Sequence, residues 1–125
     1  MRDDDHVEPT VVIVDDHGPF RAAARRMLES EGFRVVGEAD DGASGIALAR
    51  DTRPDLVLLD LVLPDQSGFD VAEALADERS KVVLVSSRGP GDFGRRRLRE
   101  SHAVGFVGKD RLSGRRLREL LEQAS

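Results

Sequence analysis

The sequence contains no cysteine, tryptophan or tyrosine, and only five phenylalanines. The missing cysteine excludes disulfides, thiolate metal ligands and a cysteine nucleophile. The scarcity of aromatic rings argues against a base-stacking platform for nucleic acid. No apolar run approaches the ~20 residues that a membrane span needs, and residues 1–9 are acidic and lack the apolar core of a signal peptide. These absences predict a soluble cytoplasmic domain with no membrane partner.

A chain of 125 residues has room for one ordinary domain. We expect that domain to span residues 10–125, preceded by a disordered acidic head, residues 1–9. The net charge of −5 is unevenly spread: residues 1–78 hold 7 Lys+Arg against 19 Asp+Glu, whereas residues 79–125 hold 12 against 5. The basic back half is either a docking face for an acidic partner or ordinary solvated surface. The acidic total and the lack of a helix-turn-helix pattern predict no direct binding of nucleic acid.

Short apolar runs alternate with helix-like stretches along the chain. The runs predict five strands, at residues 10–14, 33–37, 55–59, 82–85 and 104–108. Apolar residues at helical spacing predict helices within residues 20–28, 43–50, 68–76, 92–102 and 117–124. Gly32 should end the first helix. Continuously apolar strands that alternate with helices indicate a parallel sheet covered on both faces. The predicted fold class is therefore α/β, a doubly wound, flavodoxin-like (βα)5 sheet with strand order 2-1-3-4-5.

Polar side chains follow the predicted strands at the edge where parallel sheets bind ligands. Asp15 and Asp16 follow the first strand, Asp60 the third, Ser86 and Ser87 the fourth, and Lys109 the fifth. Adjacent strands lie ~4.8 Å apart, so Asp16 and Asp60 should nearly touch. Clustered carboxylates need a cation, and hard oxygen ligands suit Mg²⁺.

A Mg²⁺ held by Asp16 and Asp60 could also grip a phosphoryl oxygen. Lys109 could neutralise a second oxygen, and the Ser86 hydroxyl could hydrogen-bond a third. A carboxylate placed in this way can attack phosphorus. These residue types therefore point to phosphoryl transfer to an aspartate.

At this point the sequence resembles the receiver domain of two-component response regulators over nearly all of residues 10–124. The resemblance rests on four segments in order: VVIVDDHGPFR, DLVLLDLVLPDQSGFD, VVLVSS and GFVGKD. The Lys109–Asp110 pair, where many members have Lys-Pro, and VVGEADDG at residues 35–42 are similar to the LuxR-type branch. Without proline, the Lys109–Asp110 bond should be trans.

The resemblance implies a role for each matching position. Asp60 is the expected phosphoacceptor for a histidine kinase. The expected Mg²⁺ ligands are Asp16, Asp60 and the backbone carbonyl of Val62, with Asp15 acting through a metal-bound water.

Lys109 is then the phosphoryl-binding lysine, and Ser86 and Phe106 are the switch residues. Phosphorylation would reshape the face made by the fourth helix, fifth strand and fifth helix, which would bind an output domain, a partner protein or a second copy of the chain. Such a domain is not an enzyme, because it catalyses only its own phosphoryl transfer and dephosphorylation.

Several alternatives stay open from the sequence. A one-residue slip would exchange Ser86 for Ser87, and either could be a simple turn former. A pseudo-receiver, which keeps the fold without phosphorylation, is disfavoured by Asp16, Asp60 and Lys109, but the unusual Gly-rich loop at residues 86–97 leaves it open. A haloacid-dehalogenase-type phosphatase would need an acidic residue at position 62, where this sequence has Val62. A flavin mononucleotide carrier would need a first loop that holds a phosphate, and the negative charges of Asp15 and Asp16 would repel one. His17 is expected to be a surface residue.

Overall fold

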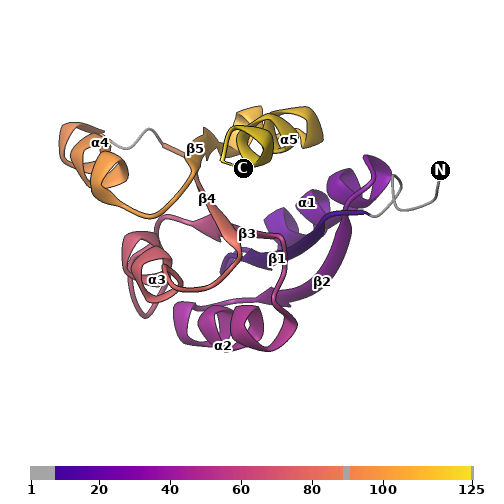
Figure 1. The fold of residues 1–125 in the computed structure, drawn as a ribbon, viewed down its shortest axis with the longest axis horizontal. Helices are drawn as coiled ribbons and strands as arrows, with labels where there is room; N and C mark the ends of the chain where they lie inside the picture. Colours follow the sequence, from indigo (N-terminus) through magenta and orange to yellow (C-terminus); the bar gives the residue numbers. More distant parts are fainter. Residues whose placement is uncertain (1–7, 89–90, 125) are drawn as a thin grey trace.

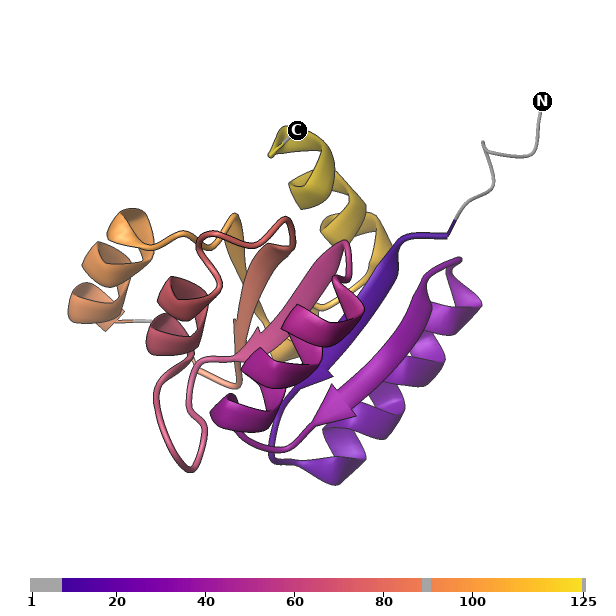
Figure 2. The ribbon, with the colours of Figure 1, turned by 60° about the horizontal axis from the view of Figure 1, so that its bottom comes forward.

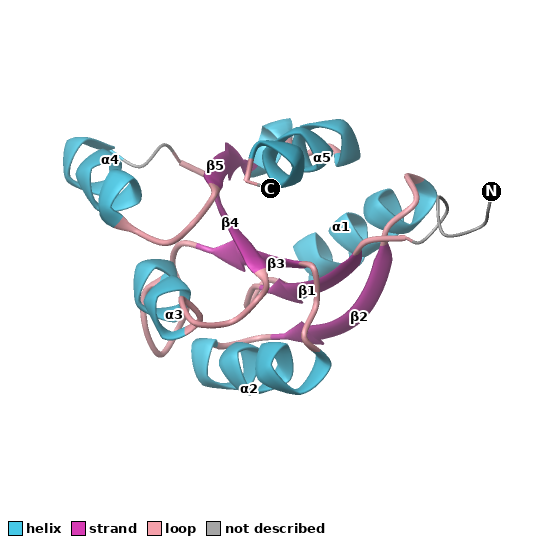
Figure 3. Cartoon of the chain, viewed as in Figure 1, coloured by secondary structure: helices cyan, strands magenta, loops and turns pink. Residues whose placement is uncertain are grey.

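The computed structural model describes residues 8–88 and 91–124 and has one five-stranded sheet. All neighbouring strands pair in parallel, in the order β2-β1-β3-β4-β5, so the predicted topology is confirmed (Figures 1 and 3). The strands are β1 (Thr10–Val14), β2 (Arg34–Ala39), β3 (Leu56–Asp60), β4 (Lys81–Ser86) and β5 (Gly105–Gly108). The helices are α1 (Gly18–Ser30), α2 (Gly42–Thr52), α3 (Gly68–Ala74), α4 (Gly91–Glu100) and α5 (Gly114–Gln123).

Each of the three central strands sends alternate side chains to two separate cores. Val11 and Ile13 of β1 face one core, with α1 and α5, whereas Val12 and Val14 face the other, with α2 and α3. Figure 1 shows α1 and α5 on one side of the sheet and α2 and α3 on the other. Because both of its faces are covered, each of the three central strands is apolar at every position between its first and last residues.

Local sequence signals set the ends of the helices. The side chains of Asp41, Ser67 and Ser113 each accept a hydrogen bond from a backbone N–H in the first turn of α2, α3 and α5. Gly32, just beyond α1, has φ +89°, a conformation that other residues rarely adopt. The predicted end of the first helix is therefore confirmed.

The predicted bounds of β1 are confirmed, and those of the other four strands differ from the predicted ones by one or two residues. β3 ends at Asp60 and β4 at Ser86, so these two residues lie inside the sheet rather than after it. Pairing with the neighbouring strand extends both strands, because Asp60 of β3 lies opposite Val85 of β4 and Ser86 of β4 lies opposite Gly108 of β5. This pairing depends on the adjacent strand and cannot be read from the apolar residues of the extended strand itself.

Most of the expected acidic head lies outside the described residues. Within the described part, the carbonyl of Pro9 accepts a hydrogen bond from the N–H of Arg34 at the start of β2. Among the described residues, no helix is both long and apolar enough to cross a membrane.

Candidate functional site

The strands all point toward one edge of the sheet, where the predicted site residues meet (Figure 2). A hollow of about 400 Å³ lies at this edge. Its walls include Asp16, His17, Asp60, Val62, Ser86 and Lys109. The topology therefore brings residues that end or follow β1, β3, β4 and β5 to one place.

Three carboxylates and one imidazole gather beside this hollow. Each of Asp15, Asp16, His17 and Asp60 offers one ligand atom, and these atoms all lie within 4.8 Å of one another. The side chains of Asp15 and Asp60 are 1% and 7% exposed, whereas that of Asp16 is 39% exposed. The expected closeness of Asp16 and Asp60 is thus present in the structure.

Lys109 supplies the positive charge. Its Nζ lies 2.7 Å from Asp15 Oδ2, 3.4 Å from Asp60 Oδ2 and 4.4 Å from the centre of the Phe20 ring. The ammonium is therefore held by two carboxylates and by a cation–π contact. The Lys109–Asp110 bond is trans as predicted, because no cis peptide occurs in the described ranges.

The surroundings of Asp60 disfavour its charged form. Burial raises the pKa of Asp60 above its ordinary value, and the charge of Asp15 raises it further. The N–H of Val62, 3.2 Å from Oδ1, and the ammonium of Lys109 oppose this shift without cancelling it. A second cation beside Asp60 would relieve the remaining repulsion.

The donor set of the site fits a hard divalent cation. Three carboxylates face one ammonium, which leaves negative charge in excess. In addition, the buried Oδ2 of Asp15 accepts no hydrogen bond of regular geometry from any described residue, although Lys109 is close to it. Oxygen donors with unused acceptor capacity suit Mg²⁺.

The two expected switch residues lie on neighbouring strands. Ser86 is buried at the end of β4, and its Oγ accepts a hydrogen bond from the N–H of Arg88. Ser87 is exposed, and both serines line the hollow. Phe106 is half-buried on β5, opposite Leu84, and packs against the core that α2 and α3 cover.

Two residues of the site have contacts that the sequence analysis missed. The ring of His17 is exposed, as expected, but its Nδ1 lies 3.3 Å from Oδ1 of both Asp15 and Asp16. Gly68 is more than a helix start: a Cβ there would lie 2.5 Å from the carbonyl oxygen of Asp60. His17 could have been found from its position next to the acidic pair, whereas the contact of Gly68 depends on the folded loop.

Arginines of the basic back half have different neighbours. Arg115 and Arg116 pair with Glu119 on the surface of α5. Arg118 instead donates to the carbonyl of Glu31 at 2.6 Å and lies over the Phe33 ring, so it joins α5 to the end of α1.

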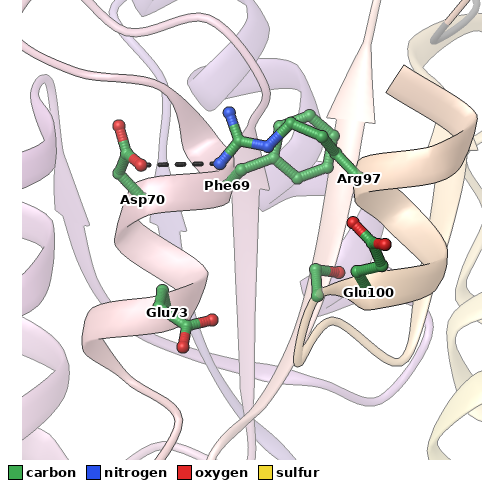
Figure 4. A pocket seen from close by; sticks show the side chains of 6 residues that line it. Phe69, Asp70, Glu73, Arg97 and Glu100 are labelled. Carbon is green, nitrogen blue, oxygen red and sulfur yellow. Dashed lines mark ion pairs between the residues drawn. The ribbon is translucent and has the colours of Figure 1, made fainter. Parts of the chain in front are cut away.

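A second hollow, of about 220 Å³, lies between α3 and α4 (Figure 4). In it Arg97 lies over the Phe69 ring at 4.6 Å and pairs with Asp70 at 3.6 Å. These contacts place part of the basic charge of α4 against α3.

Comparisons with known proteins show which family the chain resembles in sequence and in fold. The family model for the response regulator receiver domain matches residues 11–122. The virulence-factor transcription regulator BvgA of Bordetella pertussis is 41% identical over 101 residues, which cover 79% of this chain and 48% of BvgA. The response regulator GacA of Pseudomonas aeruginosa is 37% identical over 102 residues, which cover 79% of this chain and 47% of GacA.

Solved structures show the same fold. The receiver domain of the response regulator NarL from Mycobacterium tuberculosis has a TM-score of 0.76 and 32% identity, covering 94% of this chain and 93% of that one. A LuxR-family response regulator from Aurantimonas has a TM-score of 0.81 and 28% identity, covering 94% and 85%. The chain therefore belongs to the response regulator receiver domain family, the signalling domains of two-component systems. It spans about half the length of the curated relatives that it matches.

Proposed function

We propose that this domain accepts a phosphoryl group on Asp60 from the phosphohistidine of a histidine kinase. The observation that carries the proposal is the placement of Asp60, at the end of β3, with Oδ2 3.4 Å from Lys109 Nζ. An oxygen of the Asp60 carboxylate attacks phosphorus, the phosphorus–nitrogen bond breaks, and the imidazole of the kinase leaves. Lys109 neutralises charge on the transferred group.

Mg²⁺ is the proposed cofactor, and it would supply positive charge to the phosphoryl oxygens when bound. Asp16, Asp60 and the backbone carbonyl of Val62 would hold it directly, and Asp15 would act through a metal-bound water. Support comes from the excess of negative charge at the cluster and from the Asp15 oxygen that lacks a hydrogen bond.

Ser86 and Phe106 are the proposed switch. Ser86 is favoured over Ser87 because it is buried in β4 opposite Gly108, the residue before Lys109. Movement of the Ser86 hydroxyl toward a phosphoryl group on Asp60 would free space for Phe106 to turn inward, and so change the face formed by α4, β5 and α5. Because the curated relatives are transcription regulators, we propose a transcriptional output reached through this face.

The phosphoacceptor is tested with a small phosphoryl donor. Acetyl phosphate and Mg²⁺ should add one phosphoryl mass to the intact wild-type protein and none to Asp60→Asn. Asp65→Asn is the matched control, because Asp65 is an exposed aspartate in the loop that follows β3, and it should still be modified. A phosphoryl adduct on Asp60→Asn, or its loss from the Asp65 variant alone, would refute the assignment.

The output face is tested by charge reversal. Arg115 is 89% exposed and Arg116 is 45% exposed, so Arg115→Glu with Arg116→Glu should leave folding and Asp60 phosphorylation nearly intact. Sedimentation of the protein with a phosphoryl mimic should show weaker self-association, and wild-type association should fall as salt rises. The control pair Arg26→Glu and Arg34→Glu makes the same charge change at exposed positions on α1 and β2. Equal effects of both pairs would refute a role for this particular face.

A further inference from the structure

His17 adds a nitrogen donor to the cluster of carboxylates. Its Nδ1 lies 3.3 Å from Asp15 Oδ1 and 3.3 Å from Asp16 Oδ1. In an octahedral site with ligands at about 2.1 Å, adjacent ligand atoms are about 3.0 Å apart and opposite ones about 4.2 Å apart. The 3.3 Å between Nδ1 and Oδ1 of Asp16, a proposed direct ligand, is therefore close to the separation of adjacent ligands on one ion, whereas the same distance to Asp15 Oδ1 is that of a hydrogen bond.

Local structure holds His17 in this position. Its backbone N–H donates to Asp15 Oδ1 at 2.8 Å, and it is the residue that precedes α1. The imidazole does not cap the helix, and Pro19 fixes the first turn. The side chain is 69% exposed, so the ring has room to adjust to an ion at the hollow.

Lys109 and His17 face different oxygens of the cluster. The ammonium of Lys109 lies beside the Oδ2 atoms of Asp15 and Asp60, whereas the His17 ring lies beside the Oδ1 atoms of Asp15 and Asp16. A cation bound between His17 and Asp16 would therefore leave Lys109 in place. The site can hold a metal ion and keep its phosphoryl-binding lysine.

We propose that His17 is a metal ligand and that it shifts the site toward divalent ions that bind imidazole, such as Ni²⁺, Co²⁺ and Zn²⁺. The inference rests on the metal site of the proposed function and adds a nitrogen ligand to it. Imidazole suits these ions, whereas Mg²⁺ prefers oxygen. Oxygen ligands alone suit Mg²⁺, and the His17 ring is the group that would raise the affinity for these ions relative to Mg²⁺.

The test is calorimetric titration of the metal-free protein with NiCl₂ and, separately, MgCl₂ at pH 8. His17→Gln should weaken Ni²⁺ binding by about tenfold or more and Mg²⁺ binding by less than about threefold. His102→Gln is the matched control, because His102 is exposed and also has a carboxylate neighbour, Glu73 at 3.0 Å. His6→Gln serves as a second control. Neither control should alter the affinity for either metal.

A spectroscopic signature accompanies the affinities. With Co²⁺, the wild-type protein should show a hyperfine-shifted imidazole N–H resonance that is missing from His17→Gln. Far-UV circular dichroism verifies that the variant is folded, and His17→Asn replaces it if it is not, since asparagine is favourable before a helix.

Unchanged Ni²⁺ affinity in His17→Gln would overturn the inference. Equal losses of Ni²⁺ affinity and Mg²⁺ affinity would also overturn it, because they would show that the substitution acts only through the shape or charge of the site. Phosphorylation of Asp60 in Mg²⁺ is scored separately. A phosphoryl adduct on Asp60→Asn would defeat the proposed function whatever the Ni²⁺ titration shows.

Discussion

Asp55 immediately precedes β3 and Asp60 ends it, and changing each to asparagine should have opposite effects on stability. At Asp60, burial and the charge of Asp15 raise the pKa, so the folded state disfavours this carboxylate. At Asp55, burial would also raise the pKa, but hydrogen bonds from Thr10 and the charge of Arg79 lower it below its ordinary value. The folded state therefore favours the Asp55 carboxylate.

The magnitude at Asp60 follows from its burial and from the charges around it. At an effective dielectric constant of about 20, Asp15, within 4.8 Å, repels Asp60 by about 3.5 kcal/mol, and Lys109 at 3.4 Å attracts it by about 5 kcal/mol. These two charges largely offset each other, and burial, the largest cause of the raised pKa, leaves the carboxylate disfavoured by an amount on the order of 1–2 kcal/mol. Asp60→Asn should therefore raise the free energy of unfolding by about 1–2 kcal/mol in metal-free buffer at pH 8.

Replacing Asp55 should make the protein less stable. Its Oδ2 accepts from the N–H of Thr10 at 2.8 Å, and its Oδ1 lies 2.6 Å from an Arg79 nitrogen. An amide keeps part of the Thr10 contact but loses the charge, so Asp55→Asn should lower the free energy of unfolding by about 1 kcal/mol.

The two variants should also differ in their dependence on pH. Because the pKa of Asp60 is raised in the folded state, wild type loses stability as the pH rises from the ordinary carboxyl pKa through the folded-state pKa. The stability advantage of Asp60→Asn should therefore appear over this pH range and be absent below it. The lowered pKa of Asp55 means that its contribution is present above the ordinary carboxyl pKa and is lost as pH falls through the folded-state value.

Urea unfolding followed by far-UV circular dichroism measures these differences, since the chain has no tryptophan or tyrosine for fluorescence. The midpoints should move while the slopes stay equal. Mg²⁺ should then reduce the advantage of Asp60→Asn: at ten times its dissociation constant, it adds about 1.4 kcal/mol to wild type and less to Asp60→Asn. The reasoning is refuted if Asp60→Asn is less stable than wild type in metal-free buffer at pH 8.

Three further predictions concern the surroundings of the site. Gly68→Ala should destabilise the domain by several kcal/mol, because its Cβ would lie 2.5 Å from the Asp60 carbonyl oxygen; a thermal melt close to that of wild type would contradict this. Val62→Asn should speed loss of the phosphoryl group, followed by mass spectrometry, because the exposed apolar side chain beside the hollow cannot orient a water; an equal or slower rate would count against that idea. Arg118→Ala should lower the free energy of unfolding by about 1 kcal/mol through its lost contacts with Glu31 and Phe33, whereas Arg115→Ala should change it little; equal urea midpoints would show that both arginines are ordinary surface.

The sequence by itself determined the parallel sheet and the meeting of the carboxylates, and the resemblance to receiver domains supplied the strand order. Apolar runs alternating with helical periodicity specify a parallel sheet, and parallel strands end at one edge. Because β1 and β3 are adjacent in this order, Asp15, Asp16 and Asp60 are neighbours whatever their side-chain conformations. Lys109 follows β5, which is not adjacent to β1 or β3, so its contacts with Asp15 and Asp60 depend on the reach of its long side chain.

Only the tertiary structure decided the features that depend on contacts between distant parts of the chain. The strand lengths are one case: pairing with Val85 takes Asp60 into β3, although nothing in the apolar pattern marks that residue as part of the strand. The orientation of the His17 ring toward Asp15 and Asp16 is another. So is the approach of Gly68 to the Asp60 backbone. These features come from side-chain rotamers and loop paths, which packing against distant segments fixes and which have no periodic signal in the chain.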